Sequence, residues 1–372
     1  MRVLHGPVNV GNQPWVLSRH ERKLGLRSDL VVNYSTWFGY PNDKCLSQAN
    51  QRSPLGMLRR AWFAMTSPFK YDVLHYYFGR SFMTWDDLSG PKWFWHADLK
   101  LAKRLGRKVF LTMQGCDVRL SDASTERNRM TPCQIGRCGA APECRATLDA
   151  RRRNFINNIV PLADRVLVLN PELAHYVPGS QFMPYSSVDV ESFQPTWPKT
   201  TGPAVILHAP SDSSIKGSAY IQEAIDRLKQ RWDIEYVLVQ GMPYEEALKQ
   251  YRRADLIIDQ VLIGWYGGFA VEAMAMGKPV GCYIREEDLD VLPPRMRAEL
   301  PLVQLEPGRI EEQLESALRQ RKQWPEWGRR SREYVLRWHH PLRLAKALAA
   351  AYRDPESRFV LDVEPEAASC AA

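Results

Sequence analysis

Short apolar runs alternate with longer helix-like stretches along the first half of the chain. Runs of the strand type occupy residues 3–4, 30–32, 73–74, 109–111 and 165–169. Between them, stretches such as residues 99–105 have the spacing of an amphipathic helix. This alternation predicts parallel strand–helix–strand units, in which helices cover both faces of one sheet.

The same alternation resumes after an interruption near the middle of the chain. Apolar runs recur at residues 204–207, 236–239, 256–258, 280–284 and 302–303. Prolines and small polar residues fill the interruption, which is typical of a linker. We therefore expect an α/β protein of two Rossmann-like domains with doubly wound parallel sheets. The predicted domains are residues 1–185 and 204–335, joined by a linker at 186–203.

A glycine-rich segment in the second half is the strongest candidate for a ligand site. Residues 264–268 lead into a short helix that carries Glu272, and the helix ends at a Gly-Lys-Pro stop. A helix that begins in glycines turns free backbone N–H groups toward a phosphate. We therefore expect Tyr266, Gly267 and Gly268 to offer backbone donors and Glu272 to reach a ribose hydroxyl. The alternative is a plain turn followed by an exposed acid.

Three other loops follow predicted strands and hold further candidate residues. Ligands of open α/β sheets bind at such loops. An amphipathic helix follows the loop that carries Lys216, as expected of a ligand-binding loop. The alternative is that Lys216 is a lone charge in contact with solvent. Asp117 is the best carboxylate of its loop, but it is equally suited to capping the next helix. The candidates in these loops are Gly11, Gln13, Gln114, Gly115, Asp117, His208, Ser211, Lys216 and Gly217.

Several of these motifs resemble those of the GT-B glycosyltransferases, especially the family 4-like group of retaining enzymes. The resemblance rests on the segment from Gly267 to Val280, on the Lys216-Gly217 pair and on Gly115 with Asp117. It implies that Lys216 neutralises the diphosphate of a nucleotide sugar and that Glu272 holds the ribose. Asp117 would face the donor across an interdomain cleft.

This sequence departs from the family pattern at three positions. Gly264 replaces a glutamate that lies near the transferred sugar, and Asp259 is the nearest acid that would compensate. Ser211 replaces an arginine, and Gln114 replaces a histidine, so no imidazole base is present there.

The resemblance implies a sugar transfer, with retention of configuration, from a nucleotide sugar to a polysaccharide or lipid-linked acceptor. The nucleotide sugar is a substrate, and we expect neither a separate cofactor nor a metal. Residues 331–352 have the pattern of a helix that Pro341 interrupts, and the resemblance implies that the last helix, at residues 336–352, crosses back to the first domain. A non-catalytic nucleotide-sugar-binding protein is the alternative, because three motif residues are replaced. A sequence pI of about 9.1 suggests nucleic-acid binding, but the first half contains no recognisable motif for it.

Composition and charge narrow the class of protein. The chain is 45% hydrophobic and 25% charged, without an apolar run long enough to span a bilayer. It does not begin like a signal peptide, so we expect a cytoplasmic protein, either free or at the inner face of the membrane. The tail at 353–372 is rich in Glu, Ala and Ser, and we expect it to be disordered.

Positive charge is concentrated in the first half. Residues 1–185 hold 26 Lys and Arg against 14 Asp and Glu, a net charge of +12. Within this half, residues 53–70 combine cations with large apolar side chains. The pattern fits a helix in the headgroup layer of an anionic membrane, and it fits a core helix with a solvated edge equally well.

The seven cysteines are an odd number in a chain without an export signal, which favours reduced thiols. Three of them, Cys133, Cys138 and Cys144, lie in one loop rich in Gly and Pro. Their spacing lacks the paired two-residue pattern of structural zinc sites, so we expect ordinary loop cysteines.

Overall fold

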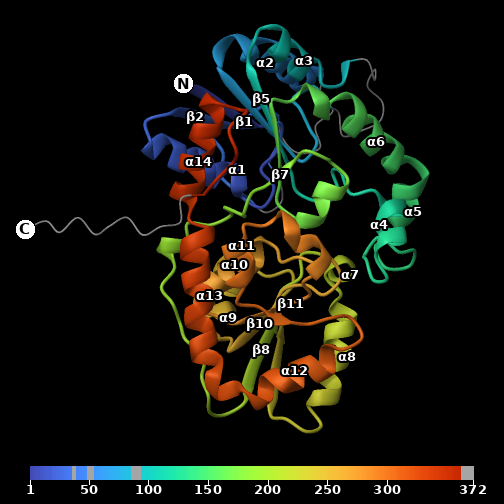
Figure 1. The fold of residues 1–372 in the computed structure, drawn as a ribbon, viewed down its shortest axis with the longest axis vertical. Coiled ribbons are helices and arrows are strands. Elements are labelled where there is room, and N and C mark those ends of the chain that lie inside the picture. Colours follow the sequence, from blue (N-terminus) through green and yellow to red (C-terminus); the bar gives the residue numbers. More distant parts are fainter. Residues whose placement is uncertain (36–38, 48–53, 85–93, 362–372) are drawn as a thin grey trace, which may run out of the picture.

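A computed structural model describes residues 1–35, 39–47, 54–84 and 94–361. It shows two parallel-sheet α/β domains, one above the other along the long axis of the molecule (Figure 1). The two domains confirm the predicted fold class.

The N-terminal sheet has seven parallel strands in the order β3-β2-β1-β4-β5-β6-β7. In chain order they are β1 (Arg2–Gly6), β2 (Arg27–Val32), β3 (Lys44–Cys45), β4 (Val73–Tyr77), β5 (Lys108–Met113), β6 (Arg165–Val168) and β7 (Gln181–Phe182). The strand order reverses between β1 and β4. A crevice at the carboxyl ends of such neighbouring strands is where open α/β sheets bind ligands.

Successive residues of these strands point to opposite faces of the sheet, as the strand period of two requires. On one face, Val3 and Phe110 pack with Leu344 of the last helix. On the other face, Leu4 and Val109 share a second core. The helices of this domain are α1 (Gln13–Lys23), α2 (Pro54–Lys70), α3 (Ala97–Arg104), α4 (Ser121–Arg127), α5 (Ala141–Glu143), the π-helix η2 (Cys144–Leu148) and α6 (Asp149–Asn158).

The C-terminal sheet has five parallel strands in the order β12-β11-β10-β8-β9. They are β8 (Ala204–His208), β9 (Ile234–Leu238), β10 (Leu256–Ile258), β11 (Val280–Cys282) and β12 (Val303–Gln304). The helices that cover this sheet are α7 (Ser213–Lys216), α8 (Ser218–Leu228), α9 (Tyr244–Arg253), α10 (Gly268–Ala275), α11 (Pro294–Ala298), α12 (Ile310–Arg319) and α13 (Trp324–Trp338). The strand order reverses between β8 and β10, so the loops after these two strands meet at one edge.

The last helix, α14 (Pro341–Arg353), begins at the predicted break and packs on α1 of the N-terminal domain (Figure 1). Its Tyr352 hydroxyl lies 2.7 Å from His75 Nδ1 and donates to Glu21 Oε1 at 3.1 Å. Lys108 Nζ donates to the Tyr352 carbonyl at 2.7 Å. The end of the chain is thus anchored to the first sheet.

The hydrophobic pattern did not predict the two-residue strands β3 and β7. Both residues of β3 are exposed, and β7 contains only one buried residue. An edge strand that buries so little carries almost no periodic signal. The part of the predicted tail at 362–372 lies outside the described residues.

Candidate functional site

Lys216 and Asp259 meet where the loops after β8 and β10 come together. Lys216 Nζ lies 2.7 Å from Asp259 Oδ1. Asp259 Oδ2 accepts a hydrogen bond from the Gly267 backbone N–H at 2.6 Å. Asp259 is fully buried, whereas 13% of the Lys216 side chain remains exposed. The buried carboxylate therefore fixes the ammonium group beside Gly267, the residue before α10.

The surroundings of Gly267 and Gly268 leave little room for a side chain, most clearly at Gly268. A Cβ atom at Gly267 would lie 3.3 Å from Lys216 Nζ, and one at Gly268 would lie 2.7 Å from Ser187 Oγ. Helix α10 begins at Gly268, and its first N–H groups lack intrahelical acceptors. The Lys216 ammonium group, paired with Asp259, therefore lies beside the start of the helix, which carries the positive end of the helix dipole.

Glu272 lies in α10 and is enclosed by tyrosines. It is 9% exposed, and its Oε1 accepts a hydrogen bond from the Tyr244 hydroxyl. Burial raises the pKa of Glu272 to about 6. Burial raises the pKa values of Tyr40 and Tyr251, and the negative charge of Glu272 raises them further. Both tyrosines therefore lie near Glu272. Tyr40 belongs to the first domain, and no motif in the sequence indicates this enclosure.

The start of α1 faces the interdomain segment across the same region. Gln13 Oε1 accepts from the Ser186 N–H at 2.9 Å, and Asn12 Nδ2 donates to the Ser187 carbonyl at 3.3 Å. Among the described residues, several buried side-chain atoms here lack a hydrogen-bond partner. They are Asn12 Oδ1, Gln13 Nε2, Ser186 Oγ and Ser187 Oγ. Buried polar atoms are normally paired, so this cluster indicates a surface that a polar ligand completes.

The loop after β5 holds Gln114, Gly115 and Asp117 in a tight turn. The Asp117 carboxylate accepts from the Gly115 N–H at 2.7 Å and from the Gln114 N–H at 3.1 Å. It therefore caps its own loop and not the following helix, whose N-cap residue is Leu120. Burial raises the pKa of Asp117. Gln114 Oε1 is buried and has no partner among the described residues.

Two residues of the predicted set have side chains committed to the core. His208 Nδ1 lies 2.8 Å from the Ile258 carbonyl and its Nε2 lies 2.8 Å from Ser218 Oγ. Burial lowers the pKa of His208 to about 4, so the imidazole is neutral at pH 7. The Tyr266 hydroxyl lies 2.8 Å from His339 Nε2, and the Tyr266 side chain is fully buried.

The remaining predicted residues shape the loops. Gly217 ends α7 at a φ of +80°, and a Cβ there would lie 2.5 Å from Val261 Cγ2. Gly11 has a φ of +62° and is exposed in the loop before α1. Ser211 is exposed ahead of α7, where Asp212 caps the helix by accepting from the N–H groups of residues 214 and 215. Neither Gly11 nor Ser211 is part of the Lys216–Asp259–Gly267 contact.

A buried ion-pair network, which the sequence did not predict, joins the two domains. Arg119 Nε donates to Glu172 Oε1 at 2.6 Å, and Arg285 Nη1 lies 3.3 Å from Glu172 Oε2. Arg285 also contacts Asp288 at 3.0 Å, and Asp288 in turn pairs with Arg127 of the first domain. Charges far apart in sequence form this network, so no local motif reveals it.

Cys116, Cys133, Cys138 and Cys144 are free thiols. Among the described residues, no group of three or more His, Cys, Asp or Glu side chains is arranged to hold a metal ion. Within the same residues, no helix is long and apolar enough to cross a membrane.

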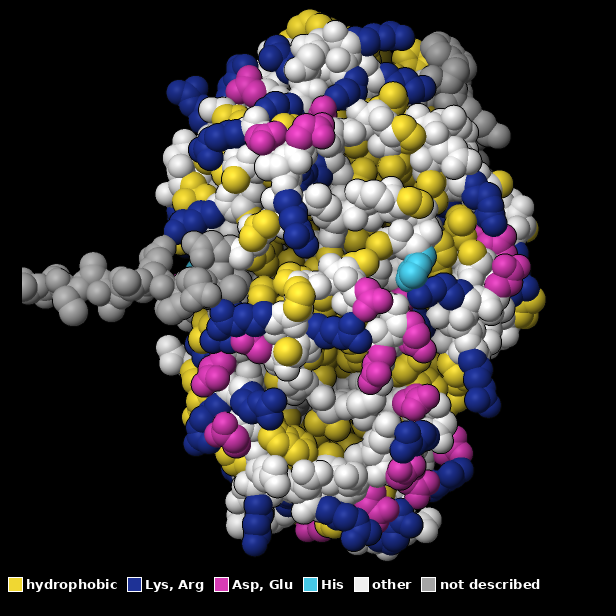
Figure 2. Space-filling view, in the orientation of Figure 1, with side chains coloured by type: hydrophobic (Ala, Val, Ile, Leu, Met, Phe, Trp, Pro, Cys, Tyr) yellow, Lys and Arg dark blue, Asp and Glu magenta, His cyan; other side chains and the backbone are white. Residues whose placement is uncertain are grey.

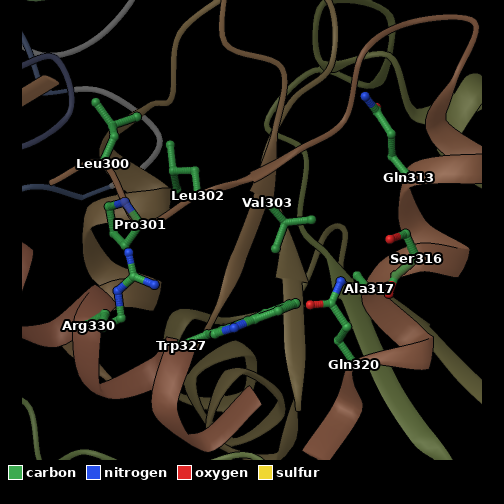
Figure 3. Close-up of a pocket in the computed structure, with 10 residues that line it drawn as sticks. All are labelled: Leu300, Pro301, Leu302, Val303, Gln313, Ser316, Ala317, Gln320, Trp327 and Arg330. Carbon is green, nitrogen blue, oxygen red and sulfur yellow. Dashed lines mark hydrogen bonds between the residues drawn. The ribbon is translucent and has the colours of Figure 1, made fainter. Parts of the chain in front are cut away.

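A pocket of about 280 Å³ lies elsewhere, in the C-terminal domain between α12 and α13 (Figure 3). Gln313 of α12 and Gln320, the residue after that helix, line it together with Trp327 and Arg330 of α13. None of the candidate residues described above lines this pocket.

Comparisons with known proteins agree with this architecture. No family model matches the sequence, and no curated protein matches it. Among solved structures, a sucrose-phosphate synthase from Thermosynechococcus elongatus is similar at 14% identity and a TM-score of 0.56, covering 94% of this chain and 98% of that one. HepE of Anabaena, solved with UDP-glucose, is similar at 12% identity with the same coverage and TM-score. A glycosyltransferase from Rickettsia africae reaches a TM-score of 0.57 at 13% identity, covering 94% and 97% of the two chains.

The chain has the GT-B fold. In this fold two Rossmann-like domains face each other, and here the Lys216–Asp259–Gly267 contact lies at the carboxyl ends of β8 and β10 in the second of them. The loops after β1 and β5 belong to the first domain.

Proposed function

We propose that the protein is a glycosyltransferase that moves a sugar from a nucleotide-sugar donor to a polysaccharide or lipid-linked acceptor. The observation that carries this proposal is the fixed position of Lys216 beside the start of α10, with Glu272 about one turn further along the helix. A cation and free helix N–H groups suit a diphosphate. A carboxylate suits the hydroxyl groups of a ribose.

In the proposed reaction an acceptor hydroxyl attacks the anomeric carbon of the donor sugar. The bond from that carbon to the diphosphate oxygen breaks, and the oxygen leaves with the bonding electron pair. Lys216 and the start of α10 stabilise the negative charge that grows on the diphosphate, which is the main way a site of this kind lowers the barrier. Because Gln114 cannot titrate near neutral pH, we assign the acceptor's proton to the departing phosphate oxygen, on the same face as the attack. Such a front-face reaction retains the configuration of the sugar.

Screening nucleotide sugars for thermal stabilisation is the direct test of the donor site. UDP-, GDP- and ADP-sugars form the panel, and UDP-glucose is tested first because HepE, which has a similar fold, was solved with it. A ligand at 100 times its dissociation constant adds about 2.7 kcal/mol to the free energy of unfolding. If no nucleotide sugar stabilises the protein, the donor site is wrong.

A non-catalytic nucleotide-sugar-binding protein is the second candidate. Gly264 favours it, because the acid that lies near the transferred sugar in the similar family is replaced there and Arg285 takes the space beside it. Calorimetry with the stabilising donor, followed by an assay for released nucleoside diphosphate, separates the two functions. Binding without turnover across a panel of glycan and glycolipid acceptors supports the second.

We also propose that the protein acts at the cytoplasmic face of a membrane, since lipid-linked acceptors are found there. The net charge of +12 on residues 1–185 supports contact with anionic lipid.

A further inference from the structure

Helix α2 directs its largest apolar side chains away from the protein. Five of them recur at helical spacing along one face and are between 37% and 73% exposed: Leu55, Leu58, Trp62, Met65 and Phe69. The opposite face is buried and consists mainly of small or polar residues: Gly56, Arg60, Ala64, Ser67 and Pro68. We call the five exposed apolar residues the α2 stripe.

The α2 stripe reverses the arrangement of an ordinary surface helix, whose apolar side packs on the core. It runs for four turns, which is roughly 21 Å at the rise of an α-helix. A continuous exposed apolar surface of this size is uncommon on a monomer and marks an interaction site. Of the two sequence interpretations of residues 53–70, the core helix describes only the opposite face of α2, where Ala64 is buried in the core.

The surroundings of the α2 stripe are cationic. Arg59 and Lys70 are exposed on α2 itself, and Lys100 and Arg104 are exposed on α3, which packs beside it. Yellow apolar and dark-blue basic side chains occur together at this end of the N-terminal domain (Figure 2).

Few acidic residues lie close to the stripe along the chain. Within residues 54–84 and 94–108, the acids are Asp72 and Asp98. Asp72 pairs with Arg2 at 2.9 Å, and buried Asp98 accepts from Ser81 Oγ at 2.6 Å. Within these two ranges, neither acid offsets the exposed cations of α2 and α3, because Asp72 is paired and Asp98 is buried.

We propose that the α2 stripe docks the protein onto an anionic lipid bilayer. The apolar side chains enter the boundary between headgroups and acyl chains, and the cations of α2 and α3 contact lipid phosphates. Charge argues against a second copy of this chain as the partner, because two such surfaces would bring like charges together. Docking needs neither donor nor turnover, so it is tested separately from the proposed transfer.

Vesicle sedimentation with the full chain is the test. One vesicle is phosphatidylcholine alone, and the other also contains phosphatidylglycerol. We expect the wild-type protein to bind the mixed vesicles, and to bind the neutral ones at least about tenfold more weakly because the cations lose their partners. Added salt also weakens binding to the mixed vesicles.

The double variant Leu58→Gln with Trp62→Gln removes the two most exposed members of the stripe, and we expect at least about a tenfold loss of vesicle binding. Val291→Gln, at an exposed apolar residue of the other domain, is the matched control and should bind like the wild-type protein. A thermal melt checks that all three proteins fold.

Equal vesicle binding by the double variant and the wild-type protein would overturn the proposal, as would a wild-type protein that binds neither vesicle. Light scattering that shows a wild-type dimer, dissociated by the double variant, would assign the stripe to a second copy instead and would also overturn it. Stabilisation by nucleotide sugars should be the same in the double variant, which keeps this result separate from the donor site.

Discussion

The Arg285 guanidinium occupies the space that a side chain at position 264 would need. A Cβ atom on Gly264 would lie 2.8 Å from Arg285 Cζ and 3.0 Å from Arg285 Cβ. Gly264 also has a φ of +87°, which strains any L-residue with a side chain. Arg285 cannot swing away at little cost because Glu172 and Asp288 hold it. The buried ion-pair network, which holds Arg285 in place, therefore favours glycine at position 264, where the similar family has a glutamate.

Gly264→Ala should destabilise the protein by about 2–4 kcal/mol, because it adds a collision in a packed region to the backbone strain. Gly308→Ala is the matched control, since Gly308 has a φ of +92° and nothing within 4 Å of a Cβ. We expect Gly308→Ala to lose only about 1 kcal/mol, the cost of the strain alone. Urea unfolding of both variants measures the difference. Equal losses would show that Arg285 does not restrict position 264.

Lys216→Ala should lower kcat/KM for glycosyl transfer by about 100-fold or more, which corresponds to about 3 kcal/mol of transition-state stabilisation. The reason is that no other ammonium group is held beside Gly267 in the described structure. Lys229→Ala, at the exposed end of α8, controls for the loss of a lysine charge and should retain wild-type turnover. A donor titration with detection of released nucleoside diphosphate gives both constants. Near-wild-type turnover by Lys216→Ala would remove Lys216 from the mechanism.

Features formed by residues close together in the sequence could be predicted, whereas contacts between distant residues could not. Long strands such as β5 and the break at Pro341 follow from local periodicity and from proline, so the fold class could be predicted. The turn at Gly267 was also identifiable, because its glycines and Glu272 lie within a few residues of one another. The pairing of Lys216 with Asp259 joins positions 43 residues apart. Only packing of the two loops brings them together.

Glu172 shows the same limit between domains. Nothing next to it in the sequence indicates a buried acid between arginines, since Arg119 and Arg285 come from different domains. The tyrosines around Glu272 are likewise spread over both halves of the chain. Sequence motifs therefore identified the glycine-rich turn and Glu272, while the contacts that fix the electrostatics around them needed the structure.

Glu172→Gln should destabilise the protein by about 3–5 kcal/mol, because it leaves two buried guanidinium groups without their shared carboxylate. Glu326→Gln is the control: Glu326 pairs with Arg329 on the surface, where such a pair contributes about 1 kcal/mol at most. Denaturant unfolding monitored by tryptophan fluorescence compares the two losses. Similar small losses in both variants would mean that water already screens the interdomain network.

Glu272→Gln should make the protein more stable at alkaline pH while weakening donor binding. The pKa of Glu272 is about 6 in the folded protein, against an ordinary value of 4.5, because burial disfavours the carboxylate. The folded protein therefore binds this proton more tightly than the unfolded chain does. As pH rises through 4.5 to 6 and above, the wild-type protein loses up to about 2 kcal/mol of stability through this group.

Glutamine at position 272 keeps an acceptor for the Tyr244 hydroxyl but carries no charge to bury. We expect thermal melts to show a gain of about 2 kcal/mol at pH 8 and less than half of it at pH 5. The same variant should bind a nucleotide sugar at least about tenfold more weakly at pH 8, since a neutral amide accepts more weakly from ribose hydroxyls than a carboxylate does. Wild-type donor affinity should fall as pH drops through 6, and the affinity of the variant should not. A variant that is less stable than the wild-type protein at pH 8, yet binds the donor equally well, would place Glu272 in the structure of α10 and outside the donor site.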